Sequence, residues 1–465
     1  MIMTGIALLL PAILGFLIIT LLLSRGTGTG LLERLCLAYP LGMGLLTVQM
    51  FLLALVRIPL TLGFAAAPVV LEIAVLYAVM KRKKIPLAGR LSFDLLRDIF
   101  SADNHRLKRA ALAILTVMAG AKLGSVVLET YLRPIFAWDA FANWSAGAKV
   151  FYHSHTLLLD VPPSDFFGKG VLDRNANYPP LNPLLQVWTS LWTGNFDEVF
   201  AKFWSPFYLL SAAVYLYLVA SRETSRLIAL VMLVLFLGSP LIAIHAVEPY
   251  SDLPLATSFL FALIAFLYAM RGKNEFWPVA GLFSAVALFT KDEATFFVVP
   301  LLLSVALFLR HSNMPAHELR KALIPLALSL LVAMPWFVFK FTHSLGFGAD
   351  YIKVTFTFHP EMAVRVAQLL LMPNNFNVVF IFFPILLIVN GRPTREFVFL
   401  LAPVACYALF FVSVYSLTGF YAGGLMFNTA VFRNILTYYP AVSLLTVLLI
   451  KNIISKSSSS PVMAG

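Results

Sequence analysis

Charged residues and cysteines are scarce in this sequence. Asp, Glu, Lys and Arg make up 12% of its 465 residues, whereas hydrophobic residues make up 60%. A soluble domain cannot cover that much apolar surface with so few charges, so the composition excludes a soluble enzyme and predicts a multi-pass membrane protein. The two cysteines, Cys36 and Cys406, lie in apolar runs. We therefore expect neither a disulfide framework nor a cysteine-based metal site.

Apolar runs of the length that crosses a bilayer recur along the chain. A helical span needs roughly 17–25 apolar residues, and about thirteen such runs predict an all-α, polytopic helical bundle. The first run, Ile6 to Leu23, lacks the basic segment and the cleavage site of a signal peptide, so we count it as a span. The predicted spans are residues 3–24, 37–56, 62–80, 108–130, 202–220, 226–244, 253–270, 276–290, 293–309, 322–340, 376–390, 397–418 and 435–450.

The distribution of positive charge predicts the orientation of these spans. The formal net charge is +12, and Lys and Arg gather in particular loops, most densely from Lys81 to Lys84. The positive-inside rule places that loop in the cytoplasm. Counting from it puts the N-terminus outside and the C-terminus in the cytoplasm, and the later basic loops also fall inside. The charge therefore reports membrane topology rather than nucleic-acid binding, with some attraction to anionic lipids.

The longest segment between spans, residues 131–200, opens with an acid among aromatic residues. Trp138 and Asp139 come directly after the fourth span. Aromatic neighbours on both sides would partly shield the carboxylate from water, which favours its protonated form. The stretch from Tyr178 to Trp192 predicts a helix in the membrane interface, with its two tryptophans at headgroup level. Asp139 is therefore the first candidate for chemistry on the outer face.

Three further groups of polar residues are expected on the same face. They are His245, Glu248 and Asp252 between two spans, Lys291, Asp292 and Glu293 in a tight turn, and Arg433 in the last outer loop. A carboxylate beside a helix N-terminus is often only a cap, and that alternative stays open for Asp252 and Asp292. Because all groups share one side of the membrane, we treat them as one candidate site.

The order of these features resembles the GT-C glycosyltransferases, in particular the branch with the protein O-mannosyltransferases and the lipid A aminoarabinose transferases. In that branch a membrane helix ends in an acid that opens a long outer loop, as at Trp138-Asp139. A Tyr/His-Pro-Pro-Leu element follows, as at Tyr178–Leu181. Next come an acid at the outer end of a helix, as at Glu248 or Asp252, and a Thr-Lys turn, as at Thr290–Glu293.

The resemblance divides the chain into three parts. They are residues 1–107, three additional helices with a basic cytoplasmic loop; residues 108–340, the GT-C-like catalytic module with outer loop 131–200; and residues 341–465, the last helices with outer loops 341–375 and 419–434. The mannosyltransferases often carry Asp-Glu where this chain has Asp139-Ala140. A second carboxylate therefore has to come from elsewhere or is absent.

The resemblance implies transfer of a sugar from a polyprenyl-phosphate donor to a lipid, glycan or protein acceptor, on the outer face of a cell membrane such as the bacterial inner membrane. Asp139 would accept the proton of the attacking hydroxyl, and Lys291 and Arg433 would bind the donor phosphate. One displacement would invert the anomeric centre. Residues expected to contact the sugar or the acceptor are Trp138, Tyr178, His245, Glu248, Asp252, Asp292 and Glu293. No cofactor is predicted, and a divalent metal is compatible with these acids but not required.

Two other functions stay as alternatives. A transporter or flippase would place ionisable groups along a pathway near the membrane midplane, whereas these groups cluster at the outer boundary and no inverted repeat is recognisable. A glycan ligase or polymerase would need more cationic residues in a large outer loop. Residues 341–375 offer only Lys353 and Arg365. The glycosyltransferase is therefore the preferred prediction.

Overall fold

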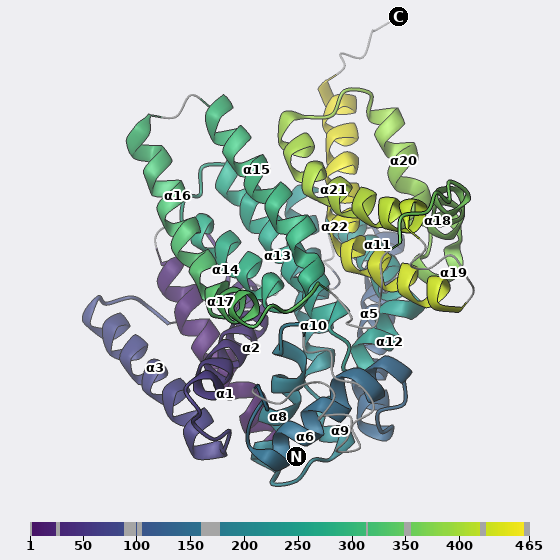
Figure 1. The fold of residues 1–465 in the computed structure, drawn as a ribbon. Helices are drawn as coiled ribbons and strands as arrows, with labels where there is room; N and C mark the ends of the chain where they lie inside the picture. Colours follow the sequence, from purple (N-terminus) through teal and green to yellow (C-terminus); the bar gives the residue numbers. More distant parts are fainter. Residues whose placement is uncertain are drawn as a thin grey trace, which may run out of the picture.

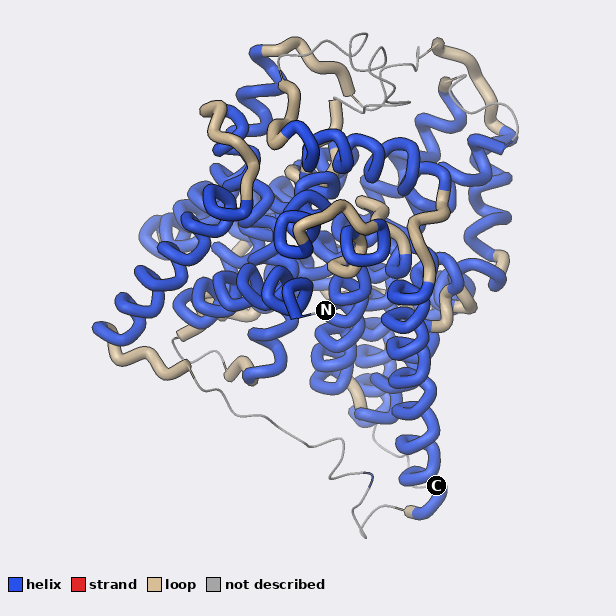
Figure 2. The backbone as a smooth tube through the Cα atoms, turned by 90° about the horizontal axis from the view of Figure 1, so that it is seen from below, coloured by secondary structure: helices blue, strands red, loops and turns tan. Residues whose placement is uncertain are grey.

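The chain is helical throughout its described residues. The computed structural model describes residues 2–24, 28–87, 99, 105–159, 177–312, 315–347, 355–418 and 425–459. Figures 1 and 2 show these residues as a bundle of α-helices with short connecting loops and no β-sheet. The predicted all-α membrane bundle is confirmed.

The helices follow one another closely along the chain. In order they are α1 (Ile2–Leu22), α2 (Leu31–Leu55), α3 (Leu62–Arg82), α5 (Arg106–Leu132), the π-helix η1 (Ala140–Ser145), α6 (Ala146–Ser154), α8 (Leu181–Thr193), α9 (Glu198–Ala201), α10 (Ser205–Glu223), α11 (Arg226–Leu237), α12 (Pro240–Val247), α13 (Asp252–Met270), α14 (Phe276–Leu288), the 3-10 helix η2 (Asp292–Ala294), α15 (Thr295–His311), α16 (Ala316–Leu330), the 3-10 helix η3 (Leu331–Ala333), α17 (Met334–Thr342), α18 (Glu361–Leu371), α19 (Pro373–Phe376), α20 (Val379–Asn390), α21 (Arg395–Leu417) and α22 (Leu425–Ser459).

Fewer helices cross the membrane than the sequence predicts. Among the described residues, 10 helical segments are long and apolar enough, or 11 if one bent pair counts as a span. The predicted spans 276–290 and 376–390 are the shorter helices α14 and α20. The predicted span 226–244 is α11 and α12, bent by 66°. The bend lies at Pro240, which begins α12 and cannot continue α11 because it lacks an N–H.

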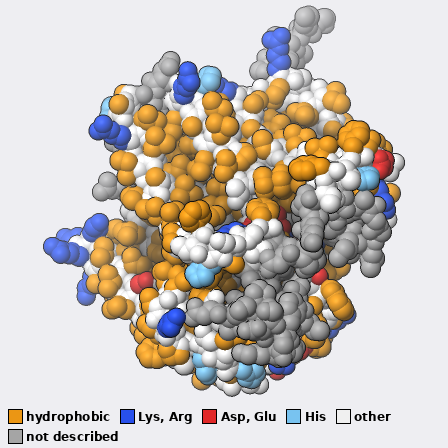
Figure 3. Space-filling view, in the orientation of Figure 1, with side chains coloured by type: hydrophobic (Ala, Val, Ile, Leu, Met, Phe, Trp, Pro, Cys, Tyr) orange, Lys and Arg blue, Asp and Glu red, His pale blue; other side chains and the backbone are white. Residues whose placement is uncertain are grey.

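The surface agrees with a membrane environment. Apolar side chains cover most of the face shown in Figure 3, and Lys and Arg gather near its edges. The chain is therefore a multi-pass membrane protein. The side of the membrane on which each end lies stays a prediction.

Helices α1 and α2 pack with their backbones in contact. A Cβ at Gly15 would lie 2.0 Å from the carbonyl oxygen of Ala38, and a Cβ at Gly42 would lie 1.8 Å from that of Pro11. Glycine is required at both positions because any side chain would push the helices apart. Helix α3 packs on α1 and α2 but leaves most of its surface exposed, at the edge of the bundle in Figure 1.

Helix α13 is the central helix, since nearly all of its residues are buried. It packs against α10, α14 and α22, and it begins at Asp252 in the candidate site. Near its other end, Arg271 pairs with Glu223 at 2.5 Å and with Glu396 at 2.6 Å, and Lys451 pairs with Glu223 at 2.7 Å. These ion pairs join α10, α13, α21 and α22 at the end of the bundle away from Asp252.

The helix predicted after Tyr178 is present as α8 and is covered by other helices. Trp188 is fully buried, and its indole N–H donates to the carbonyl of Ala7 at 2.7 Å. Helix α8 packs against α1, α2 and α6. Trp188 therefore does not contact lipid headgroups as predicted, because helix α1 covers its ring. Helices α6, α8 and α9 lie at the lower end of the bundle in Figure 1, opposite the end of α22.

Candidate functional site

Asp139 is placed by an irregular stretch of helix. It stands directly before the π-helix η1, which continues into α6, and its side chain does not cap η1. Turns of π-helix frequently occur at functional sites. The carboxylate instead forms an ion pair with the guanidinium of Arg433 on α22, 294 residues further along the chain. Two predicted site residues are therefore in direct contact.

The aromatic shield predicted around Asp139 is absent. Trp138 is 78% exposed and Phe141 is 47% exposed, so neither covers the carboxylate. The side chain of Asp139 is itself 28% exposed. The environment of this acid is therefore set by the cation of Arg433 rather than by apolar neighbours.

A second cluster centres on Lys291, just before η2. Its ammonium lies 3.1 Å from Asp252 and 3.4 Å from Glu293, and the hydroxyl of Tyr178 donates to Glu293 at 3.1 Å. Burial disfavours the charged form of Lys291, but the carboxylates of Asp252 and Glu293 outweigh burial and raise its pKa above the ordinary value. A lysine with a raised pKa stays protonated throughout the neutral range. Lys291 is therefore a fixed positive charge at the site.

Tyr250 and His245 join the two clusters. The guanidinium carbon of Arg433 lies 5.9 Å from the centre of the Tyr250 ring. The centre of the His245 ring lies 4.5 Å from that of Tyr250. His245 Nε2 in turn lies 3.8 Å from a carboxylate oxygen of Asp252. One continuous group of contacts thus joins seven of the predicted residues from scattered parts of the sequence: Asp139, Tyr178, His245, Asp252, Lys291, Glu293 and Arg433.

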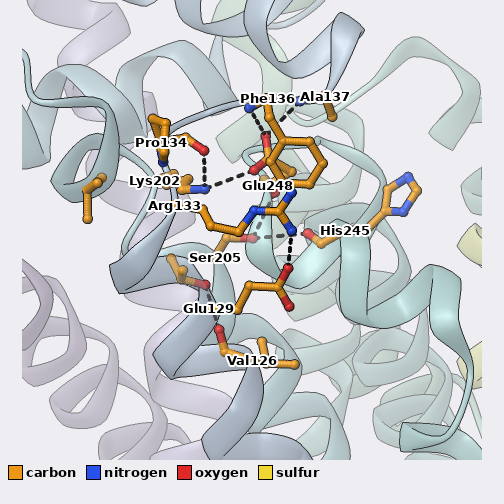
Figure 4. A network of polar contacts seen from close by, with 12 residues as sticks. Val126, Glu129, Arg133, Pro134, Phe136, Ala137, Lys202, Ser205, His245 and Glu248 are labelled. Carbon is orange, nitrogen blue, oxygen red and sulfur yellow. Dashed lines mark hydrogen bonds and ion pairs between the residues drawn. The ribbon is translucent and has the colours of Figure 1, made fainter.

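Glu248 lies outside this group, and both of its carboxylate oxygens already have hydrogen-bond donors. Figure 4 shows its carboxylate between Lys202 and the segment that follows α5. Both side chains are fully buried, with Lys202 Nζ 2.8 Å from Glu248 Oε1. Glu248 Oε2 accepts hydrogen bonds from the backbone N–H of Phe136 at 3.1 Å and of Ala137 at 3.3 Å, and Lys202 also donates to the carbonyl of Pro134 at 3.1 Å.

This network fixes the backbone immediately before Asp139. Contact with a sugar or an acceptor, the role predicted for Glu248, does not fit a carboxylate without exposed surface and with both oxygens engaged. Of the two acids that the family resemblance left open, Asp252 is the one in the contact group. Asp292 also has a separate partner, since it pairs with Lys340 of α17 at 2.5 Å.

Three residues of this region were not predicted from the sequence. Lys202 and Lys340 are single charges at the edges of apolar runs, and Tyr250 stands between His245 and Asp252. A lone charge in an apolar run is buried only with a partner, so Lys202 could have been expected to pair with an outer-face acid. The sequence contains no signal for which acid that is.

A cavity lined by aromatic side chains adjoins the site at Tyr178. Trp144, Trp336, Phe339 and Phe51 line it together with Tyr178. Tyr178 therefore belongs both to the charged group, through Glu293, and to an apolar wall. In the described part of the chain, no three His, Cys, Asp or Glu side chains lie close enough together to hold a metal ion.

Comparisons with known proteins bear on this arrangement. Residues 178–339 match the family model described as dolichyl-phosphate-mannose-protein mannosyltransferase. This segment includes Tyr178, Asp252 and Lys291, whereas Asp139 and Arg433 lie outside it. The fold is similar to the crystal structure of ArnT from Cupriavidus metallidurans in the apo state, with a TM-score of 0.51 and 15% identity. At 15% identity this likeness shows the fold alone.

The likeness to ArnT extends over part of each protein. The match covers 73% of this chain and 60% of the ArnT chain. A second structure of ArnT, bound to undecaprenyl phosphate, matches with a TM-score of 0.49 and 15% identity over 74% of this chain and 63% of that one. No curated protein sequence matches the chain significantly. The fold that the motif order predicted is thus confirmed.

Proposed function

We propose that this protein is a GT-C glycosyltransferase that moves a sugar from a polyprenyl-phosphate donor to a lipid, glycan or protein acceptor at the outer face of the membrane. The observation that carries the proposal is the contact of Asp139 with Arg433 in one group with Lys291. A carboxylate and two cations are the groups that such a transfer requires. The matching family model is itself named after a lipid-phosphate sugar donor.

The reaction assigns a task to each charge. The acceptor hydroxyl attacks the anomeric carbon, the bond from that carbon to the phosphate oxygen breaks, and the lipid phosphate departs. Asp139 accepts the hydroxyl proton, and Arg433 and Lys291 stabilise the phosphate as negative charge develops on it. A single displacement of this kind inverts the anomeric centre.

Donor binding would also release the base. The carboxylate of Asp139 is engaged by the guanidinium of Arg433. Arginine binds phosphate in bidentate fashion through charge-assisted hydrogen bonds. A donor phosphate that draws Arg433 away therefore leaves Asp139 free to act as a base only when the donor is in place.

The test is a single-turnover assay of purified protein in lipid nanodiscs with labelled polyprenyl-phosphate sugars. We expect Asp139→Asn to bind the donor but to transfer sugar at least about 100-fold more slowly, because general base catalysis is lost. The matched control is Glu361→Gln on α18, which removes a carboxylate outside the candidate site whose side chain is 67% exposed.

Two outcomes would contradict the proposal. Transfer by Asp139→Asn at the wild-type rate would remove Asp139 from the chemistry. Absence of donor consumption by the wild-type protein, together with movement of labelled lipid across the bilayer, would favour the transporter alternative.

A further inference from the structure

Among the described residues, two charged side chains without an ion-pair partner lie deep inside membrane spans and outside the candidate site. They are Glu72, near the middle of α3, and Lys122 on α5. Charges inside the hydrocarbon region are costly unless they are paired, and they usually mark a function. Neither residue lies in the segment that matches the mannosyltransferase family model. Neither residue contacts the residues assigned to the proposed transfer reaction.

Glu72 has a hydrogen-bond donor but no cation beside it. The side-chain N–H of Gln49 on α2 donates to Glu72, and no ion pair joins Glu72 to any residue in the described ranges. The carbonyl oxygen of Gln49 is buried and has no hydrogen-bond partner among the residues that the structure describes. Two acceptors, one of them a carboxylate, are thus left in need of a donor.

These two residues are the polar part of an otherwise apolar groove. The groove has a volume of about 580 Å³ and runs between α2, α3 and the junction of α16 with α17. Leu52, Leu328 and Leu331 line it and are 43%, 60% and 55% exposed, so the groove is open towards the lipid. An occupant has to be apolar along its length and to carry a donor at one depth.

Lys122 offers a donor on an apolar helix. Only 17% of the apolar window of α5 is buried, and Met118 and Ser125 beside Lys122 are exposed. The ammonium of Lys122 has no ion-pair partner within the part of the chain that the structure describes. Helix α5 therefore presents an unpaired cation on a partly exposed face inside the membrane.

The two charges lie at corresponding depths. Glu72 is ten residues from the start of α3 at Leu62, and Lys122 is ten residues from the end of α5 at Leu132. Each distance is about 15 Å along the helix axis. The two helix ends lie on the same side of the bundle, because the backbone before α3 bonds at Leu60 to His155, which follows α6.

We propose that the groove beside α3 receives α5 of a second copy of this chain, with Lys122 of that copy donating to Glu72 and Gln49. The charges are complementary and their depths agree. Helices α3 and α5 lie on opposite sides of the bundle in Figure 1, so the contact is between two different surfaces. Such a contact repeats from copy to copy and produces rings or rows in the membrane plane.

The test measures self-association of the full chain in lipid vesicles, by single-molecule photobleaching across a range of protein-to-lipid ratios. We expect Glu72→Lys alone and Lys122→Glu alone to weaken association at least 10-fold, because each places like charges against one another. When the two variants are mixed, every contact between unlike copies again joins Lys to Glu. We expect the mixture to associate as wild type does, which also shows that both variants fold.

The control is Gly63→Leu, which adds bulk to α3 at a position where an added Cβ would have no other side chain or helix within 4 Å. It is expected to leave association unchanged, since Gly63 does not line the groove. Three results would each overturn the proposal. They are a wild-type protein that stays monomeric at every ratio, single variants that associate like wild type, and a mixture that fails to associate.

Discussion

At the scale of single residues, the contact between Asp139 and Arg433 is the most consequential feature. It brings the predicted base into direct contact with a predicted phosphate ligand that lies 294 residues away in the chain. Lys291 does not share this arrangement, because its partners are Asp252 and Glu293. The proposal therefore gives the two cations different roles: Arg433 would move from the base to the donor phosphate, whereas Lys291 keeps its carboxylate partners.

Replacing Arg433 tests this difference. We expect Arg433→Gln to weaken binding of polyprenyl phosphate at least about 10-fold, since charge-assisted hydrogen bonds contribute about 1.5–3 kcal/mol. Arg433→Lys should restore part of the affinity but not the bidentate contact. The measurement is a titration of the lipid in nanodiscs, with Arg365→Gln on α18 as the control. An unchanged dissociation constant for Arg433→Gln would exclude this residue from the phosphate site.

At the scale of elements, the buried pair of Lys202, just after α9, and Glu248, just after α12, holds the segment between α5 and η1. Glu248 holds the backbone N–H groups of Phe136 and Ala137, and this fixes the approach of the chain to Asp139. A buried ion pair contributes little net stability compared with apolar residues of similar size, but breaking it leaves a buried charge. The pair of Lys202 and Glu248 therefore serves mainly to position the segment that contains Phe136 and Ala137.

Removing one partner or both separates positioning from ligand contact. Glu248→Gln leaves the ammonium of Lys202 buried without its counter-charge and is expected to lower the free energy of unfolding by about 3–5 kcal/mol. The double variant Lys202→Met with Glu248→Met should recover much of that loss, while sugar transfer stays slow because Phe136 and Ala137 lack their acceptor.

Unfolding by denaturing detergent and the single-turnover assay give the two readouts. A Glu248→Gln variant with wild-type stability and a raised KM for the acceptor alone would contradict this account. It would return Glu248 to the acceptor-binding role predicted from the sequence.

At the scale of the whole molecule, the ionic groups gather at two opposite ends of the bundle. The candidate site lies at the end where α13 begins, and the cluster around Arg271 lies at the end where α13 stops. The positive-inside rule predicts that the first end is outside and that the basic end of α3 is in the cytoplasm.

Site-directed labelling of intact cells tests this orientation. In a chain whose Cys36 and Cys406 are replaced by alanine, Trp138→Cys should react with a membrane-impermeant maleimide, since Trp138 is 78% exposed. Lys83→Cys, at the exposed end of α3, should react only after the cells are opened. The reverse pattern would invert the topology and place the site in the cytoplasm.

The sequence by itself determined the properties that depend on local composition and order. The length of apolar runs predicted the membrane bundle, and the order of Trp138-Asp139, Tyr178–Leu181 and Thr290–Glu293 predicted the GT-C superfamily. These features are readable because a span has to be apolar throughout and because a motif occupies consecutive residues. The grouping of polar residues at one end of the bundle followed from the positive-inside rule.

Only the tertiary structure decided which residues meet. Asp139 pairs with Arg433, Glu248 with Lys202 and Asp292 with Lys340, and each choice depends on how distant helices pack. The same packing buries Trp188 under α1. Charge and hydropathy can be read from each residue in the sequence. The ion-pair partner of a buried charge depends on the fold, because the charge pairs with whichever opposite charge the packed helices bring within reach.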